Sequence, residues 1–234
     1  MDCKQQQAKH KDIYHIGIDG PSASGKGTVA KRLSQHLNIP CLDTGAMYRG
    51  VAVYVLDNKI DPKDETAVTT ALESMNMRTD IAPTGETKIF LNDKDITNRL
   101  RENNISVITS PLSQFASVRD KLVAMQQDIA KTQSFILEGR DIGTVVLSHA
   151  KYKFFLTASA KVRAKRRFEE LASQTKDSTA PSFKEILKQV KQRDKNDRTR
   201  KIGPLKKAKG AIKIDASHLT IDETVDRILK FVMQ

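Results

Sequence analysis

Short apolar runs of strand length recur along the chain and alternate with segments of helical periodicity. The apolar runs cover residues 14–19, 39–42, 134–137, 151–156 and 211–214. Runs of this length and composition are typical of strands that are buried on both faces of a parallel sheet. Because helical segments lie between most of them, the pattern predicts an α/β fold with a five-stranded parallel sheet flanked by helices.

The helical segments place their apolar residues on one face each. Four stripes follow this spacing: Val29, Ala30, Leu33 and Leu37; Val118, Leu122, Met125 and Ile129; Phe183, Ile186, Leu187 and Val190; and Val225, Ile228, Leu229 and Val232. Such stripes predict helices that pack against the sheet or against one another. Two capping boxes, Ser182 with Glu185 and Thr220 with Glu223, mark helix N-termini.

The middle of the chain departs from this alternation. Residues 88–91 and 94–96 are short β segments that flank Asn92 and Asp93, a dipeptide suited to a hairpin turn. We therefore expect a small β-containing insert over about residues 72–112 instead of another βαβ unit. Residues 173–182 are rich in Ser, Thr, Asp and Pro and follow a charged helical segment, which predicts a mobile lid over about residues 160–182.

The length of 234 residues fits one core with an inserted lobe, so we expect one domain at residues 13–234 after a disordered polar tail at 1–12. No apolar run reaches the roughly 20 residues that a membrane helix needs, and the tail has no apolar signal core. Cys3 and Cys41 have no Cys or His cluster near them, which argues against a disulfide framework or a zinc site. These features predict a protein of the reducing cytoplasm without a membrane partner.

The formal net charge of +12 allows two interpretations. A basic protein can neutralise the phosphates of a nucleic acid, or it can gather arginines in one cleft for small polyanions. With 4 Tyr, 8 Phe and no Trp, the chain offers little for a base-stacking platform, and it has no basic–aromatic interleaving. We therefore expect small polyanionic ligands and no nucleic-acid partner.

Residues 16–28 carry the most specific chemistry of the chain. They combine a short apolar strand, a Gly-rich turn and the start of an amphipathic helix. Gly20 and Gly25 let several backbone N–H groups converge on one oxyanion, and the helix directs its positive dipole end at the same point. Lys26 adds a positive charge for the outer phosphates, so the segment predicts nucleotide binding. Gly27 follows this lysine and the hydroxyl comes one position later, at Thr28, so we do not assign Thr28 as a direct Mg²⁺ ligand.

Polar clusters follow two of the other predicted strands. Residues 42–49 come after the second strand and residues 137–144 after the third, and the carboxyl ends of parallel strands form the usual ligand crevice. Glu138 follows an apolar run, as in a Walker B strand, which makes it a candidate to hold Mg²⁺ directly or through water.

Two further groups stand out. Ser110 and Arg119 form one group, and Arg193, Asp197 and Arg200 form the other. The spacing i, i+4, i+7 of the second group predicts one face of a continuing helix.

Taken together, these motifs resemble those of the bacterial cytidylate kinases from about residue 15 to the C-terminus. The motifs are Asp-Gly-Pro-Ser-x-x-Gly-Lys-Gly-Thr at 19–28, Asp-Thr-Gly-Ala-Met-Tyr-Arg at 43–49, Glu-Gly-Arg-Asp-Ile-Gly-Thr at 138–144 and Arg-Asp-x-x-Asp-Arg-x-Arg at 193–200. The insert looks like the extra lobe of the bacterial enzymes, which eukaryotic UMP/CMP kinases lack. Thr44 stands where many members have Ser. Ala116 stands where Pro is expected, which would loosen the loop that sets Arg119.

The resemblance implies a P-loop kinase fold with an inserted lobe that binds the nucleoside monophosphate, and a monomer. The implied activity is ATP-dependent phosphorylation of CMP and dCMP to CDP and dCDP in pyrimidine metabolism, with Mg²⁺ bound to ATP. The implied catalytic residues are Lys26, Arg140, Arg193 and Arg200. ATP binding is implied for Gly20, Pro21, Ser22, Ala23, Ser24, Gly25, Lys26, Gly27, Thr28, Arg163 and Arg167. CMP binding is implied for Ser22, Thr44, Tyr48, Arg49, Ser110, Arg119, Arg140, Asp141, Arg193, Asp197 and Arg200.

The chemistry of phosphoryl transfer agrees with such a set. Two polyanions must be brought together, which requires several cations, and the planar fork of Arg grips two phosphate oxygens at once. Since the second pKa of a phosphate is about 6, the acceptor oxygen is already mostly ionised and no general base is required. For base choice, we expect Asp141 to accept from the cytosine amino group and Arg119 to donate to the ring, an arrangement that rejects uracil.

Three alternatives remain open at this stage. Another small-molecule kinase of the same fold, acting on UMP, AMP or shikimate, would differ in its acceptor. A P-loop ATPase that acts on nucleic acid would show nucleic-acid-stimulated turnover that CMP does not affect. A nucleotide sensor would bind both nucleotides without forming products, although four intact motif clusters argue against it.

Overall fold

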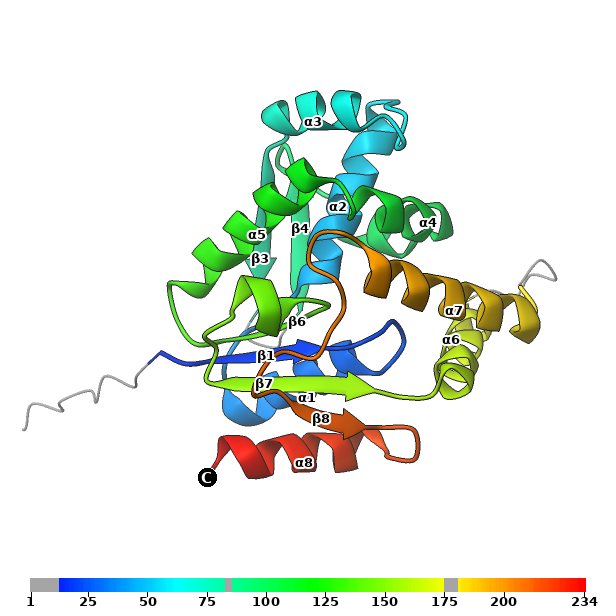
Figure 1. Ribbon diagram of the computed structural model, residues 1–234. Helices are drawn as coiled ribbons and strands as arrows, with labels where there is room; N and C mark the ends of the chain where they lie inside the picture. Colours follow the sequence, from blue (N-terminus) through cyan, green and yellow to red (C-terminus); the bar gives the residue numbers. More distant parts are fainter. Residues whose placement is uncertain (1–12, 83–85, 175–180) are drawn as a thin grey trace, which may run out of the picture.

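The computed structural model describes residues 13–82, 86–174 and 181–234. Its centre is a five-stranded parallel sheet in the order β2-β6-β1-β7-β8 (Figure 1). The strands are β1 (His15–Asp19), β2 (Cys41–Asp43), β6 (Phe135–Gly139), β7 (Tyr152–Thr157) and β8 (Ile212–Asp215). The predicted α/β fold and the five predicted strands are confirmed, with bounds that shift by one or two residues. The tail predicted for residues 1–12 and residues 175–180 of the predicted lid lie outside the described residues.

Helices cover both faces of this sheet. On one face lie α1 (Lys26–Leu37) and α8 (Ile221–Val232), and on the other lie α2 (Thr44–Asp57) and α5 (Ala116–Ala130) (Figure 1). Side chains alternate between the two apolar clusters along a strand, so Ile136 joins the cluster under α1 and α8 while Leu137 joins the other. The near-continuous apolar runs of the sequence are explained by this double coverage.

A second, antiparallel sheet forms in the region predicted as an insert. It consists of β3 (Met77–Ile81), β4 (Thr87–Leu91) and β5 (Lys94–Asp95) in that order. Asn92 and Asp93 have φ angles of 47° and 65°, the left-handed pair that a tight two-residue hairpin turn requires. The predicted hairpin is therefore present. Around this sheet lie α3 (Glu65–Ser74), the 3₁₀ helix η1 (Thr97–Arg101) and α4 (Asn103–Leu112).

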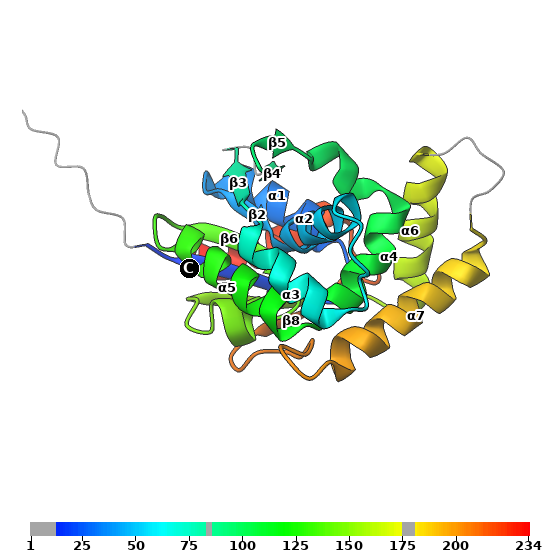
Figure 2. The same cartoon turned by 90° about the horizontal axis from the view of Figure 1, so that it is seen from above.

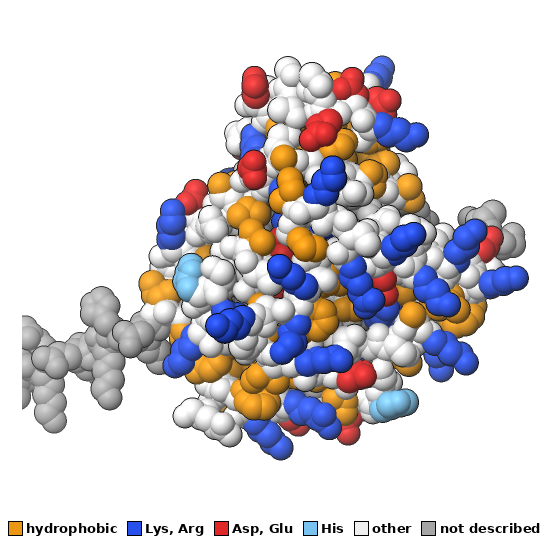
Figure 3. All heavy atoms as spheres, viewed as in Figure 1, with side chains coloured by type: hydrophobic (Ala, Val, Ile, Leu, Met, Phe, Trp, Pro, Cys, Tyr) orange, Lys and Arg blue, Asp and Glu red, His pale blue; other side chains and the backbone are white. Residues whose placement is uncertain are grey.

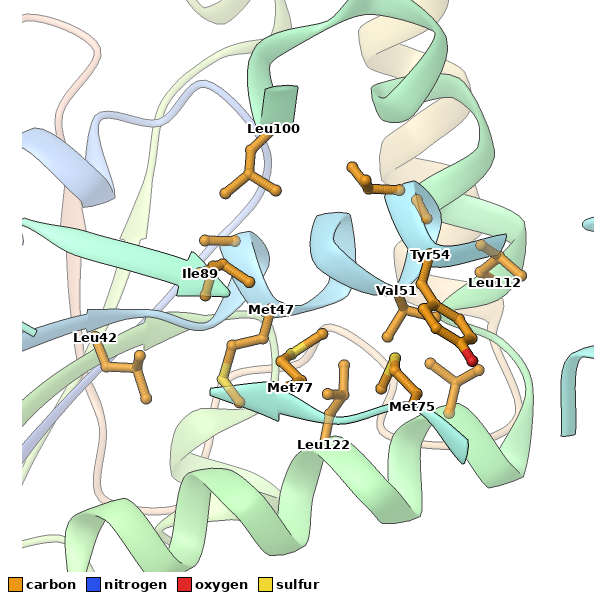
Figure 4. Close-up of a cluster of buried hydrophobic side chains, with 14 of the residues drawn as sticks. Leu42, Met47, Val51, Tyr54, Met75, Met77, Ile89, Leu100, Leu112 and Leu122 are labelled. Atoms are coloured by element: carbon orange, nitrogen blue, oxygen red, sulfur yellow. The ribbon is translucent and has the colours of Figure 1, made fainter. Parts of the chain in front are cut away.

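One apolar cluster joins this second sheet to the main sheet through α2 and α5. Met47 and Val51 of α2, Met77 and Ile89 of the small sheet, and Leu122 of α5 belong to it, and their side chains converge in Figure 4. A glycine of α2 makes the close approach possible: a Cβ on Gly50 would lie 2.8 Å from the Met77 Cε atom. The small sheet is consequently fixed to the core by packing, not only by its connections.

The last pair of helices extends from the carboxyl ends of the strands. These are α6 (Ala160–Gln174) and α7 (Phe183–Thr199), which pack on each other through a small apolar cluster that contains Ala164, Ile186 and Val190 (Figures 1 and 2). Both predicted capping boxes are present, at the N-termini of α7 and α8. Within the described part of the chain, no helix is long and apolar enough to cross a membrane.

We predict that Leu122→Ala lowers the free energy of unfolding by about 2–5 kcal/mol, the range for a buried leucine truncated to alanine. Leu122 is fully buried at the junction of α5 with the small sheet, so its loss leaves a cavity there. Urea unfolding followed by circular dichroism measures the change. Val107→Ala in α4 is the control because Val107 is 72% exposed, and a similar loss in both variants would contradict the packing described here.

Candidate active site

A cavity of about 640 Å³ lies where β1, β2 and β6 end. It collects residues from α2, α4, α6 and α7. Most of the residues predicted from the sequence line it: Ser22, Ala23, Gly25, Lys26, Gly27, Thr28, Thr44, Tyr48, Arg49, Ser110, Glu138, Arg140, Asp141, Arg167, Arg193, Asp197 and Arg200. Five predicted residues are not part of the lining: Gly20, Pro21, Ser24, Arg119 and Arg163.

The phosphate loop, residues 20–25, connects β1 to α1. Ala23 and Gly25 have φ angles of 58° and 95°, and both line the cavity. Left-handed residues at alternate positions turn successive N–H groups to the same side, which makes a concave anion site. Gly20 serves a different purpose, since a Cβ there would lie 2.0 Å from the carbonyl oxygen of Leu156 in β7. Its missing side chain lets the loop leave the sheet next to β7.

Lys26 lies buried at the first position of α1. Its Nζ donates to the Pro21 carbonyl at 3.0 Å and lies 3.8 Å from Oε2 of Glu138. Burial, reinforced by the charge of Arg140, lowers the pKa of Lys26 to about 7. Burial and the charge of Asp43 raise the pKa of Glu138 to about 7. A bound polyphosphate would favour the charged form of Lys26 and so raise its pKa again.

Gly27 gives the carboxylate of Glu138 room beside the phosphate loop. A Cβ at position 27 would lie 3.3 Å from Oε1 of Glu138, so a larger residue would crowd the carboxylate. In the described chain, no group of three or more His, Cys, Asp or Glu side chains could hold a metal. Mg²⁺ in nucleotide sites takes only one or two carboxylates and completes its shell with phosphate and water, so Glu138 beside the loop suits it.

At the end of β2, Asp43 caps α2 and positions Arg49. Its Oδ1 accepts from the Ala46 amide at 3.1 Å, and its Oδ2 accepts from Arg49 Nη2 at 2.7 Å. Burial opposes ionisation of Asp43, but the charge and hydrogen bond of Arg49 outweigh it and the pKa is lowered. Asp43 was not predicted as a site residue. Its place before the helix start, in an N-cap position, was the signal that could have identified it.

On the opposite wall, α7 supplies Arg193 and Asp197. Arg140, which follows β6, donates from Nε to Oδ2 of Asp197 at 2.9 Å. The Nε atom of Arg193 is buried and has no hydrogen-bond partner. Burial and the nearby charge of Arg140 lower the pKa of Arg193 to about 10, so it remains protonated at neutral pH. A buried guanidinium with a free donor is suited to an anionic or polar ligand.

Asp141 lies between two arginines. Its Oδ2 accepts from Arg119 Nη2, and its Oδ1 is 3.3 Å from Arg200 Nη2. The side chain of Arg119 is almost fully buried, and its Nε and Nη1 atoms have no partner. Tyr48 covers this group, with its ring centroid 5.9 Å from the Arg119 guanidinium carbon. Asp141 and Tyr48 line the cavity, whereas Arg119, which both of them contact, does not.

Two local expectations were wrong. Arg200 does not continue the helical face of Arg193 and Asp197, because α7 ends at Thr199 and Arg200 is its extended C-cap. Its Nε atom donates to the Gly203 carbonyl at 2.6 Å, which turns the side chain back toward Asp141.

Ala116 does not lie in a loop: it is the first residue of α5, so Arg119 is held in the first helical turn. Proline is favoured at a first helical position for its fixed φ, and alanine is a good helix former there.

Arg163 was expected to contact ATP, but the structure places it behind the phosphate loop. It is 3% exposed and bonds to Ser22, Ala158 and Asp194 instead of facing the cavity. Arg166, one turn further along α6, lines the cavity and was missed. The two positions differ only in helical phase, so the direction of α6 relative to the loop was needed to choose between them.

Asp19 is a further residue to which we assigned no role. It is buried at the end of β1 and accepts from the amides of Ile142 and Gly143 at 2.7 and 2.8 Å. Burial raises its pKa to about 6. These bonds tie the end of β1 to the π-helix η2 (Ile142–Val146), and so fix the segment that carries Arg140 and Asp141.

Comparisons with known proteins show which family the chain resembles. A family model described as Cytidylate kinase matches residues 16–234. A cytidylate kinase of Clostridium botulinum (strain Loch Maree / Type A3) is 44% identical over 220 residues, which cover 93% of this chain and 96% of that one. One from Caldicellulosiruptor bescii is 41% identical over 216 residues, with 92% and 94% covered. An uncharacterized protein from Eubacterium ventriosum shares the fold, with a TM-score of 0.51, 16% identity and coverage of 94% and 99%.

We predict that binding of a non-hydrolysable nucleoside triphosphate takes up close to one proton at pH 8 through Lys26. At that pH a lysine with a pKa of about 7 is mostly uncharged, and the bound phosphates raise its pKa again. At pH 6 Lys26 is already protonated, so this uptake disappears. Titration calorimetry in buffers of different ionisation enthalpy measures the proton count.

The matched control is Lys31→Met, which removes an exposed lysine of the same helix and leaves the proton uptake unchanged. Lys26→Met abolishes the uptake at pH 8. Equal uptake in Lys26→Met and in the unmodified protein would contradict the assignment to Lys26.

Proposed function

The chain belongs to the cytidylate kinase family, and we propose that it transfers the terminal phosphoryl group of ATP to CMP and dCMP, yielding ADP with CDP or dCDP. One observation carries this proposal: the phosphate loop and a group of arginines from four other segments share a single cavity. The arginines are Arg49, Arg140, Arg166, Arg167, Arg193 and Arg200. Two facing polyanions need such a concentration of positive charge to approach each other.

On the donor side, the phosphate loop and Lys26 bind the phosphates of ATP. The N–H groups of the loop and the dipole of α1 favour negative charge at this place. Lys26 Nζ can exchange the Pro21 carbonyl for phosphate oxygens when the nucleotide enters. Glu138, together with the phosphates of the nucleotide, would hold Mg²⁺, which supplies charge neutralisation for the transferred group.

On the acceptor side, Arg49, Arg140 and Arg200 bind the phosphate of CMP, with Ser22, Thr44 and Tyr48 near them. Arg193 and Asp197 face the ribose. The transfer needs no general base, because the acceptor phosphate is largely ionised at neutral pH. The protein's contribution is to align the acceptor oxygen, stabilise charge and exclude water, which would otherwise hydrolyse ATP.

Ser110, Arg119 and Asp141 form the group that we assign to the base of the acceptor. Cytosine and uracil present opposite hydrogen-bonding groups to it. Cytosine presents an amino donor and a bare ring nitrogen, and uracil reverses both. The carboxylate of Asp141 accepts from the amino group, while a free donor of Arg119 serves the ring. The unpartnered Nε and Nη1 atoms of Arg119 support this assignment, because a buried guanidinium gains from a ligand that completes its hydrogen bonds.

The elements around the cavity divide between the two nucleotides. Residues 72–112 are proposed as the lobe for the nucleoside monophosphate, since Ser106, Thr109 and Ser110 of α4 line the cavity. Residues 160–182 are proposed as the lid over ATP, since Arg166 and Arg167 of α6 line the cavity from the other side.

One chain supplies the residues for both nucleotides, so a monomer is sufficient for the reaction. We further propose that the protein acts in the cytoplasm without a nucleic-acid partner, in agreement with the free, buried thiol of Cys41.

A phosphoryl-acceptor panel with ATP and Mg²⁺ tests the function. The panel contains CMP, dCMP, UMP, AMP and shikimate, and ADP formation is followed by a coupled assay. We expect CMP and dCMP to be the best acceptors. Preference for another acceptor would reassign the substrate, and turnover that depends on RNA or DNA but not on CMP would overturn the proposal.

We predict that Asp141→Ala lowers kcat/KM for CMP by about 100-fold or more but lowers that for UMP much less, because only cytosine presents a donor to this carboxylate. Asp120→Ala is the matched control, as it removes a neighbouring exposed acid outside the main cavity. Steady-state kinetics with both acceptors give the ratio. Equal losses for CMP and UMP would show that Asp141 acts on Arg119 and Arg200 alone.

A further inference from the structure

Arg163 uses its whole guanidinium group behind the phosphate loop. Its Nε donates to the Ala158 carbonyl at 2.9 Å, and its Nη1 donates to the Ser22 carbonyl at 3.1 Å. Nη1 and Nη2 also bond to Oδ1 and Oδ2 of Asp194 at 2.9 and 2.5 Å. The side chains of Arg163 and Asp194 are 3% and 12% exposed, and neither residue lines the cavity. A pair of this geometry is far more constrained than a surface ion pair.

A second arginine of α6 contacts the next carbonyl of the loop. Arg166 donates from Nη1 to the Ser24 carbonyl at 3.2 Å and from Nη2 to the Ala216 carbonyl at 2.8 Å. Two contacts, at the carbonyls of Ser22 and Ser24, therefore run from α6 to the loop.

These carbonyl contacts determine where the loop amides point. In a trans peptide the C=O and the N–H of one peptide unit point in opposite directions. The Ser22 carbonyl shares its peptide with the Ala23 N–H, and the Ser24 carbonyl shares its peptide with the Gly25 N–H. Arg163 does not line the cavity, and it holds the Ser22 carbonyl on the side of the loop away from it. The Ala23 amide of the same peptide is therefore directed toward the cavity that Ala23 lines.

The backbone conformation of Ala23 shows why the loop needs these carbonyl contacts. Its φ angle of 58° is in the left-handed region, which is uncommon for a residue with a side chain. Asp194 in turn orients Arg163, since its carboxylate occupies both Nη atoms and leaves Nη1 directed also at Ser22. The carboxylate comes from α7, the helix that also carries Arg193 and Asp197 of the acceptor side.

We propose that Arg163 and Asp194 form a positioning pair for the phosphoryl-transfer reaction, which fixes the Ser22 peptide so that the Ala23 amide binds the phosphates of ATP. The pair contacts neither substrate. It acts through the backbone of the loop, and it links the donor side of the cavity to α7. This assignment rests on the proposed kinase function, and it predicts that loss of the pair impairs ATP binding and turnover more than CMP binding.

The first test is Arg163→Lys. Lysine keeps the positive charge beside Asp194 but lacks the planar fork, so it cannot also serve the Ser22 and Ala158 carbonyls. We expect kcat to fall at least about 10-fold, as for a misplaced transition-state donor. We expect the affinity for a non-hydrolysable ATP analogue to fall as well, whereas the affinity for CMP measured alone changes less than about threefold. Lys165→Ala, at an exposed position of the same helix, is the control and leaves all three values unchanged.

The second test separates positioning from stability. The double variant Arg163→Met with Asp194→Leu replaces the buried ion pair by apolar side chains, a change that is often neutral or stabilising for a fold. We expect its melting temperature to approach that of the unmodified protein, while kcat and affinity for the ATP analogue remain low because the Ser22 carbonyl still lacks its donor. Recovery of activity together with stability would overturn the proposal, and so would equal losses of CMP and ATP affinity.

The outcomes also separate this proposal from the proposed function. If the double variant does not fold, the kinetics and binding of Arg163→Lys decide. If the unmodified protein does not phosphorylate CMP at all, the kinase assignment fails. Binding of the ATP analogue to the unmodified protein, Arg163→Lys and Lys165→Ala then still tests the role of the pair: unchanged affinity in Arg163→Lys would refute it.

Discussion

The mutual repulsion of cations gathered in one cavity is the constraint on which the rest of the structure depends. Before any phosphate enters, Lys26 and several arginines must lie close together with little access to water. The protein meets this constraint by giving the cations acidic partners: Glu138 near Lys26, Asp43 for Arg49, Asp197 for Arg140, and Asp141 for Arg119 and Arg200. Each partner neutralises charge and also fixes the direction of the cation that it contacts. Figure 3 shows a largely basic outer face, where the charges are solvated and need no such partners.

The fold supplies this arrangement through its topology. In a parallel sheet every carboxyl end lies at the same edge, so the segments after β1, β2 and β6 meet although they are far apart in sequence. Asp19 then joins two of these segments directly, through the amides of Ile142 and Gly143. The acidic and basic groups of the site are therefore held by backbone elements that the apolar core has already placed.

The sequence predicted the sheet and the hairpin because apolar periodicity and turn chemistry are local signals. Most of the cavity lining was implied instead by the resemblance of the motifs to those of the cytidylate kinases. The residues that it misassigned depend on orientation instead. Arg163 and Arg166 are three positions apart on α6, and only the packing of that helix decides which of them lines the cavity and which lies behind the loop. Arg200 was placed on a helix that had already ended, because its contact with the Gly203 carbonyl depends on the chain reversing direction. Asp19 acts on the backbone amides of Ile142 and Gly143, far away in the sequence, and such partners leave no mark in side-chain spacing.

The two walls of the cavity differ in how they are attached. The small sheet and α4 share one continuous apolar cluster with the main sheet, whereas α6 and α7 have only a small cluster of their own and meet the phosphate loop through polar contacts. Water can replace polar contacts during a motion, but it cannot replace buried apolar surface without a large penalty. Entry of substrates and departure of products should thus be asymmetric: the α6–α7 side yields while the side of the small sheet stays still.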